Sequence, residues 1–106
     1  MREIAISQLQ EFIKAKDYQP ALKHEYFLKL AEEVGELSRA MRKNATPATE
    51  ENFKGTIEEE IYDVIYYALA IANCYDIDVE KCIYIKEKLN DKKYARNYAD
   101  SLLKGE

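Results

Sequence analysis

Glycine and proline are scarce in this 106-residue sequence, which holds three Gly, two Pro and no Trp. Turn-rich β folds need Gly and Pro at their many tight turns, so this scarcity argues against a sandwich or a barrel. Hydrophobic residues make up 47% of the chain and charged residues 34%, a mixture typical of long helices. We therefore expect an all-α protein, and the length predicts one domain over residues 1–106.

Cysteine and long apolar runs are also scarce. Cys74 and Cys82 are the only cysteines and lack CxxC spacing, which predicts two reduced cytoplasmic thiols that pack as small apolar residues. The longest apolar run, residues 64–72, is too short to cross about 30 Å of hydrocarbon. Arg2 and Glu3 follow Met1 with no long apolar stretch, so we also expect no signal peptide.

The chain lacks an excess of positive charge. Its formal net charge is -4 and its pI is about 5.1. Nucleic-acid polymers and anionic membrane surfaces attract basic proteins, so neither is an expected partner. A small phosphorylated ligand remains compatible with this charge if a cation joins it to the protein.

Apolar residues at three- and four-residue spacing predict four helices. Their expected limits are Ile4 to before Asp17, Pro20 or Ala21 to Arg42, Ile57 to about Tyr75, and Val79 to about Leu103, with the part after Tyr94 able to bend away. The inward-facing residues are predicted to be Phe27, Leu30, Val34, Leu37 and Met41 in the second helix, and Val79, Cys82, Ile83 and Leu89 in the fourth. Short connections favour antiparallel neighbours and hence a four-helix bundle.

The third helix has the clearest start and the most apolar surface. Thr56 and Glu59 form a capping-box pattern that places the first helical residue at Ile57. A loop at residues 44–55 precedes this helix and can lie over the side chains that the helix exposes. Because the helix is apolar around most of its circumference, it should be buried on several sides, which predicts at least a homodimer.

Two pairs of acids have matching i, i+3 spacing: Glu33 with Glu36, and Glu60 with Asp63. Each pair borders the apolar stripe of its helix, so antiparallel packing would bring four carboxylates together. Such a group repels itself unless cations neutralise it, and Mg²⁺ or Mn²⁺ suits oxygen ligands. Solvated helix faces are the alternative; a di-iron site is excluded because it needs Glu-x-x-His pairs and the only histidine is His24.

Residues 30–37, LAEEVGEL, followed by residues 60–64, EIYDV, resemble the EExxE and ExxD motifs of the MazG-like nucleotide pyrophosphohydrolases. The resemblance covers about residues 26–94. It implies a four-helix bundle of the all-α NTP pyrophosphatase type, completed by oligomerisation, that converts a nucleoside triphosphate to the monophosphate and pyrophosphate. It also implies Mg²⁺ ligands at Glu33, Glu36, Glu60 and Asp63, and a role for Glu32 in orienting or deprotonating the attacking water.

Lys86, Asn90 and Lys93 share one face of the fourth predicted helix, where they could contact phosphate or simply face solvent. They also resemble the family's later element of a lysine, an asparagine four residues on, a base and a tyrosine. Many relatives continue with proline after that tyrosine, whereas this chain has Ala95. The resemblance therefore implies a substrate-binding role for the three residues and leaves the path of the tail open.

The leading hypothesis is a Mg²⁺-dependent nucleoside triphosphate pyrophosphohydrolase, active as a homodimer or homotetramer, that removes noncanonical or surplus dNTPs. Phosphoribosyl-ATP is the alternative substrate, because the related hydrolase shares the acidic motifs. A helical oligomer that binds nucleotide or metal without catalysis is the non-enzymatic alternative.

Overall fold

The computed structural model describes residues 2–43 and 47–103, and all regular structure within those ranges is helical. The all-α prediction is confirmed. The first three residues of the predicted loop, 44–46, lie outside the described residues, and residues 47–56 are non-helical as predicted. The elements are α1 (Ile6–Lys16), the 3₁₀ turn η1 (Pro20–Leu22), α2 (Lys23–Arg42), α3 (Ile57–Cys74), α4 (Val79–Lys93) and the 3₁₀ turn η2 (Ala99–Leu102).

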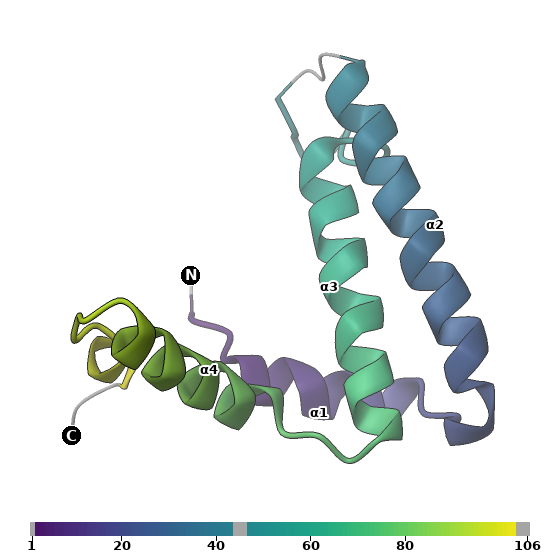
Figure 1. Cartoon of the computed structure of the whole chain (residues 1–106). Coiled ribbons are helices and arrows are strands. Elements are labelled where there is room, and N and C mark those ends of the chain that lie inside the picture. Colours follow the sequence, from purple (N-terminus) through teal and green to yellow (C-terminus); the bar gives the residue numbers. More distant parts are fainter. Residues whose placement is uncertain (1, 44–46, 104–106) are drawn as a thin grey trace.

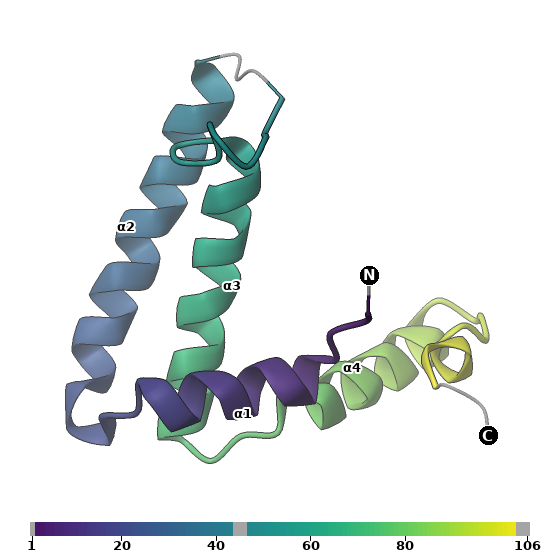
Figure 2. The same ribbon diagram turned by 180° about the vertical axis from the view of Figure 1, so that it is seen from behind.

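Helices α2 and α3 form a long antiparallel pair, and α1 crosses beneath one end of it (Figure 1). Helix α4 leaves that same end and runs away from the pair, as the view from behind in Figure 2 also shows. The main contacts of α4 are with α1 and η2. The four predicted helices are present, but α4 does not cover the α2–α3 pair within one chain.

The core lies where α1 crosses the base of the α2–α3 pair. Ile13 of α1 is fully buried there against Tyr26, Leu69 and Ala70, and Val79 at the start of α4 packs on the same cluster. A buried aliphatic side chain of this size contributes about 1.5–3 kcal/mol. This small core fixes the base of the helix pair and therefore the register in which α2 faces α3.

Gln10 of α1 ties the turn between α3 and α4 to this core. Its side-chain amide donates to the carbonyl oxygen of Ile77 at 2.5 Å and accepts from the backbone N–H of Val79 at 3.2 Å. Its own backbone carbonyl accepts from the side chain of Asn73 at 3.0 Å. Gln10 and Asn73 are both buried, so these bonds satisfy polar groups that water does not reach.

Asp17 holds the turn between α1 and α2. Its carboxylate accepts hydrogen bonds from the hydroxyls of Tyr26 at 2.7 Å and Tyr66 at 3.0 Å, one from each helix of the pair. Burial, together with the negative charge of Asp17, raises the pKa of Tyr26 to about 12. Burial and the same carboxylate also raise the pKa of Tyr66, so both tyrosines remain protonated donors at neutral pH.

The predicted starts of α3 and α4 agree with the structure, whereas α1 begins at Ile6 rather than at Ile4 and α2 also begins later than predicted. The Thr56 hydroxyl accepts from the backbone N–H of Glu59 at 3.2 Å, and Asp78 caps α4 in the same way through Lys81. Helix α2 begins at Lys23 rather than at Pro20 or Ala21, because the preceding residues form a tighter 3₁₀ turn.

Helix α4 ends at Lys93, so the predicted continuation to about Leu103 is wrong, and the predicted alternative, in which the part after Tyr94 bends away, is confirmed. Ala95 has a φ of 52°, which proline cannot adopt, so the tail follows a path that proline at this position would prevent. The Asp91 carboxylate then accepts from the backbone N–H groups of Tyr98 and Ala99 and from Arg96. This carboxylate folds the tail back against α4.

Several residues predicted to face inward are exposed in one chain. In α2 this applies to Phe27 (58% exposed), Val34 and Met41, and in α4 to Ile83 and Leu89. Cys82 is exposed as well, so its predicted packing is wrong, although both cysteines are free. The apolar pattern identified the helices correctly, but no other described element of the chain covers these faces.

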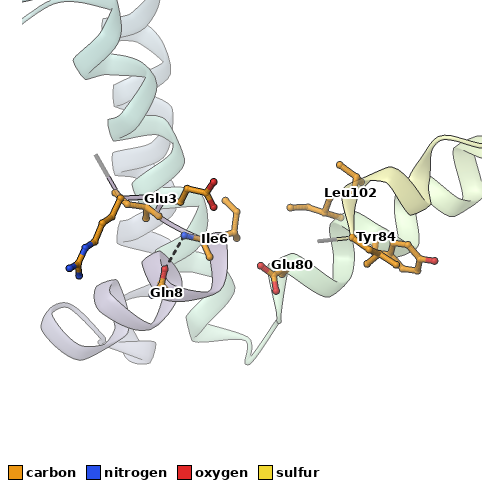
Figure 3. Close-up of a pocket in the computed structure, with 11 residues that line it drawn as sticks. Glu3, Ile6, Gln8, Glu80, Tyr84 and Leu102 are labelled. Atoms are coloured by element: carbon orange, nitrogen blue, oxygen red, sulfur yellow. Dashed lines mark hydrogen bonds between the residues drawn. The ribbon is translucent and has the colours of Figure 1, made fainter. Parts of the chain in front are cut away.

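A cavity of about 950 Å³ lies between the start of α1 and the arm formed by α4 and η2. Figure 3 shows Ile6 and Gln8 on one side and Tyr84 and Leu102 on the other. Its lining is mostly apolar, and it does not include the predicted acidic residues. No helix in the described ranges is long and apolar enough to span a membrane.

Replacing Gln10 with Ala should lower the free energy of unfolding by about 2 kcal/mol, because the Val79 N–H and the Ile77 carbonyl lose their partner. Urea denaturation at fixed protein concentration measures this change. Glu11→Ala, an exposed neighbour on α1, serves as the control and should alter stability by less than about 0.5 kcal/mol. Equal effects of the two variants would show that the Gln10 hydrogen bonds do not stabilise the fold.

Candidate active site

Three of the predicted acids meet between α2 and α3. Glu33 comes from α2, and Glu60 and Asp63 lie one turn apart on α3; one carboxylate oxygen from each lies within 4.8 Å of the others. Antiparallel packing produces this meeting because it sets the middle of α2 against the first two turns of α3. The i, i+3 spacing predicts only that the acids lie along one flank of each helix. The register of α2 against α3 then brings Glu33 to Glu60 and Asp63.

Glu60 is the most buried member of this carboxylate cluster, which we define as Glu33, Glu60 and Asp63. Glu60 is only 8% exposed, while Glu33 and Asp63 are half-buried. The Oε1 atom of Glu60 is buried without a hydrogen-bond partner. An unpaired carboxylate oxygen in such a place costs free energy unless a proton or a cation satisfies it.

The electrostatics of the carboxylate cluster reflect its crowding. Burial, followed by contact with the Glu33 carboxylate, raises the pKa of Glu60 from its ordinary value of 4.5 to about 7. Burial, together with the negative charges of Glu33 and Glu59, also raises the pKa of Asp63, and the positive charge of Lys54 opposes that rise. Without a cation, the protein relieves the repulsion by retaining a proton near neutral pH.

A hard divalent cation fits the carboxylate cluster. All its donors are oxygens, the group that Mg²⁺ and Mn²⁺ prefer, and they converge from two helices. The unpaired Oε1 of Glu60 supplies a ligand atom that has no competing hydrogen bond. The residues present could therefore hold a metal ion.

The other two predicted acids lie outside the carboxylate cluster. Glu36 is exposed, about 4.5 Å further along the axis of α2 than Glu33. Glu32 is exposed too, and its carboxylate lies 3.4 Å from the ammonium group of Lys29. Both acids are on the helix that carries Glu33, but neither carboxylate belongs to the group formed with Glu60 and Asp63. Their predicted roles as a metal ligand and as the group that orients water therefore stay predictions.

The predicted phosphate-binding residues are on α4. Lys86 and Lys93 are exposed, Asn90 is half-buried, and α4 packs on α1 and η2 rather than along α2 and α3. The chain therefore does not bring these three residues to its own carboxylate cluster.

The residue-by-residue reading of the sequence missed two further groups near the carboxylate cluster. Tyr67 lies one turn beyond Asp63 on α3 and is half-buried, and burial raises its pKa, with the negative charges of Glu33 and Asp63 contributing. Lys54 precedes α3 and lowers the pKa of Asp63. The i, i+4 spacing from Asp63 to Tyr67 was available as a signal, whereas the position of Lys54 depends on the folded turn.

The fold and the site define a helical protein with a carboxylate-lined candidate metal site between two antiparallel helices. Residues 22–96 match the MazG nucleotide pyrophosphohydrolase domain, and the chain belongs to this family. It is thus an enzyme that hydrolyses phosphoanhydride bonds of nucleotides.

Solved structures agree with this assignment. Ntag-iMazG from Vibrio DAT 722 is 46% identical with a TM-score of 0.82, and the alignment covers 88% of this chain and 100% of that one. Ctag-iMazG from the same source is 45% identical with a TM-score of 0.79, covering 83% of this chain and 99% of that one. No curated protein sequence shows a significant match.

Metal-free protein should lose stability as pH rises from about 4.5 to about 7, because folded Glu60 retains its proton over this range while the unfolded chain releases it. Asp63 acts in the same direction. Added Mg²⁺ should raise the melting temperature most near about pH 8, where the carboxylates are charged.

Thermal unfolding with EDTA or with Mg²⁺, followed across this pH range, measures both effects. The Glu60→Gln variant serves as the control, because it removes the charge that titrates. It should show a flatter pH dependence and a smaller shift with Mg²⁺. Stability of the wild-type protein that rises with pH in EDTA would contradict the expected protonation of the carboxylate cluster.

Proposed function

We propose that the enzyme hydrolyses a nucleoside triphosphate to the monophosphate and pyrophosphate, with Mg²⁺ as its cofactor and Mn²⁺ as a substitute. The observation that carries this proposal is the meeting of Glu33, Glu60 and Asp63 with a buried, unpartnered Glu60 oxygen, in a member of the MazG family. Glu36 is the fourth proposed ligand. A triphosphate and several carboxylates repel each other strongly, so they need cations between them.

In the proposed reaction a water oxygen forms a bond to the α-phosphorus while the bond from that phosphorus to the bridging oxygen of pyrophosphate breaks. Glu32 accepts the proton of the attacking water, and its exposed position next to Glu33 makes it accessible to that water. Lys29, 3.4 Å from Glu32, limits where this carboxylate can lie. A bound divalent cation supplies charge neutralisation and withdraws electrons from the phosphorus.

Noncanonical or surplus dNTPs are the proposed physiological substrates, with phosphoribosyl-ATP as the alternative to test. Metal-dependent release of pyrophosphate should appear in a panel of modified and ordinary dNTPs and NTPs and disappear in EDTA. Glu60→Gln should lose at least about 100-fold in kcat/KM and also lose stabilisation by Mg²⁺. Glu32→Gln should lose turnover but retain stabilisation by Mg²⁺, because it leaves the proposed ligands intact.

Three results would count against this proposal. Full activity of Glu60→Gln would refute the ligand assignment. Release of pyrophosphate from phosphoribosyl-ATP alone would move the substrate to that compound. A folded protein that binds metal and nucleotide but releases no pyrophosphate from any of these substrates would favour the non-enzymatic alternative.

We further propose that the active form contains a second copy of the chain, as a homodimer or homotetramer. Apolar side chains remain exposed on α2 and α3, including Phe27, Met41 and Ile61 at 58%, 61% and 45%. The acidic site lies on this helix pair, while Lys and Arg outnumber Asp and Glu between residues 81 and 104. Opposite charges and uncovered apolar faces favour packing of α4 from one copy near the site of another.

In that arrangement Lys86, Asn90 and Lys93 would contact phosphate in the neighbouring copy. Glu60→Gln and Lys86→Met/Lys93→Met should each have low activity alone. When they are unfolded together and refolded as a mixture, a dimer should regain about a quarter of wild-type activity, because half of the dimers pair the two variants and each of these has one intact site. Activity equal to the average of the two parents would show that each site is complete within one chain.

A further inference from the structure

Glu60 lies at the start of α3, where a helix is held least firmly. The first four N–H groups of a helix have no partner within it, so its start frays unless other groups satisfy them. The buried core is at the other end of the helix pair, where α1 crosses (Figure 1). Leu69, the first α3 residue of that buried core, is about 13.5 Å further along the helix axis than Glu60. The position of Glu60 therefore depends on how the start of α3 is held.

Thr56 holds the start of α3 through three hydrogen bonds. Its side-chain hydroxyl accepts from the backbone N–H of Glu59 at 3.2 Å and donates to the carbonyl oxygen of Phe53 at 2.7 Å. Its own carbonyl oxygen accepts from the backbone N–H of Glu60 at 3.1 Å. Thr56 is only 5% exposed, so water competes little for these groups. Thr56 thereby joins the preceding turn to the amides that begin α3, including that of Glu60.

Glu59 reinforces the same turn and differs in this respect from Glu60. The Glu59 carboxylate accepts from the backbone N–H of Gly55 at 2.6 Å. Gly55 has a φ of 81°, a conformation that other residues adopt only at a cost. The Oε1 atom of Glu60, by contrast, is buried without a hydrogen-bond partner. Of these two consecutive acids, one closes the turn and the other brings an unsatisfied oxygen to the carboxylate cluster.

We propose that Thr56 is a positioning residue of the carboxylate cluster, which holds the Glu60 carboxylate in place before a divalent cation binds. This inference rests on the proposed function, because it takes the carboxylate cluster as the metal site. When a site is formed for only a fraction of the time, its apparent affinity falls by that fraction. Loss of the Thr56 cap shifts the start of α3 toward the frayed state, in which Glu60 is no longer held beside Glu33 and Asp63.

Calorimetric titration of Mg²⁺ into the substrate-free protein tests the proposal without turnover. Thr56→Val keeps the shape of the side chain but removes both hydrogen bonds of the hydroxyl, so it should bind Mg²⁺ about five- to tenfold more weakly. Thr56→Ser restores the hydroxyl and should bind Mg²⁺ within about twofold of the wild type. Circular dichroism at the temperature of the titration establishes that each variant is folded.

Asp78→Ala is the matched control, because the Asp78 carboxylate caps α4 by accepting from the backbone N–H of Lys81 at 3.2 Å. This variant should lower the melting temperature about as much as Thr56→Val does and leave the affinity for Mg²⁺ unchanged. Equal affinity of Thr56→Val and the wild type would overturn the proposal. Equal weakening by the two cap variants would also overturn it, because a general loss of stability would then explain the effect.

Amide hydrogen exchange provides a second readout that does not depend on activity. Without metal, the backbone amides of Glu59 and Glu60 should exchange about fivefold faster in Thr56→Val than in the wild type. Saturating Mg²⁺ should restore most of the protection, because coupling between metal binding and ordering of the helix start is reciprocal. Asp78→Ala should leave both amides unchanged. Exchange in Thr56→Val at the wild-type rate would refute the positioning role.

Gly55→Ala tests the same turn while the hydroxyl stays in place. A methyl group added at Gly55 meets no atom within 4 Å, so the positive φ of this residue is what resists the change. The variant should also weaken binding of Mg²⁺, and it decides the question if Thr56→Val does not fold. Wild-type affinity of Gly55→Ala would then count against the proposal.

The positioning role and the proposed reaction can fail separately. Weaker Mg²⁺ binding by Thr56→Val, combined with no pyrophosphate release by the wild type from any substrate, would support the positioning role and refute the reaction. Pyrophosphate release by an enzyme whose Mg²⁺ affinity does not depend on Thr56 would refute the positioning role alone. A wild type that binds neither Mg²⁺ nor Mn²⁺ would overturn both.

Discussion

Mutual repulsion among Glu33, Glu60 and Asp63 is the constraint on which the site depends. Three negative charges cannot remain uncompensated in a partly buried corner between two helices, and the raised pKa values of Glu60 and Asp63 express that cost. A proton relieves it in the metal-free protein, and a bound cation would relieve it more completely. The packing of α2 on α3 therefore stores an unfavourable interaction that the proposed ligand would release.

The rest of the chain supports this helix pair from one end. Ile13, the Gln10 hydrogen bonds and the Asp17 carboxylate join α1 to the base of the pair, far along α3 from the first turns that carry the acids. Stability is thus concentrated at the base, while the destabilising acids lie toward the other end. The apolar faces left uncovered on α2 and α4 are the surfaces on which the proposed second copy would pack.

Local signals in the sequence were sufficient where the structure depends on neighbouring residues. The Thr56 and Asp78 caps were predicted because the hydroxyl or carboxylate reaches an amide three residues away. The sequence left open whether the part after Tyr94 continues α4 or bends away. Contacts of the Asp91 carboxylate with Arg96, Tyr98 and Ala99 bend it away, and helix periodicity does not predict such contacts. Inward packing of Leu89 was predicted wrongly for a related reason: an apolar stripe does not say which chain covers it.

The sequence by itself determined the helical class and the acids available to a metal ion, because helix periodicity and i, i+3 spacing are properties of a single segment. The acidic motifs also carried the resemblance to the family. Only the tertiary structure decided which acids meet. The register of α2 against α3 brings Glu33 to Glu60 and Asp63, leaves Glu36 exposed, and buries one Glu60 oxygen without a partner. That register arises from packing between the two helices, so neither segment contains it alone.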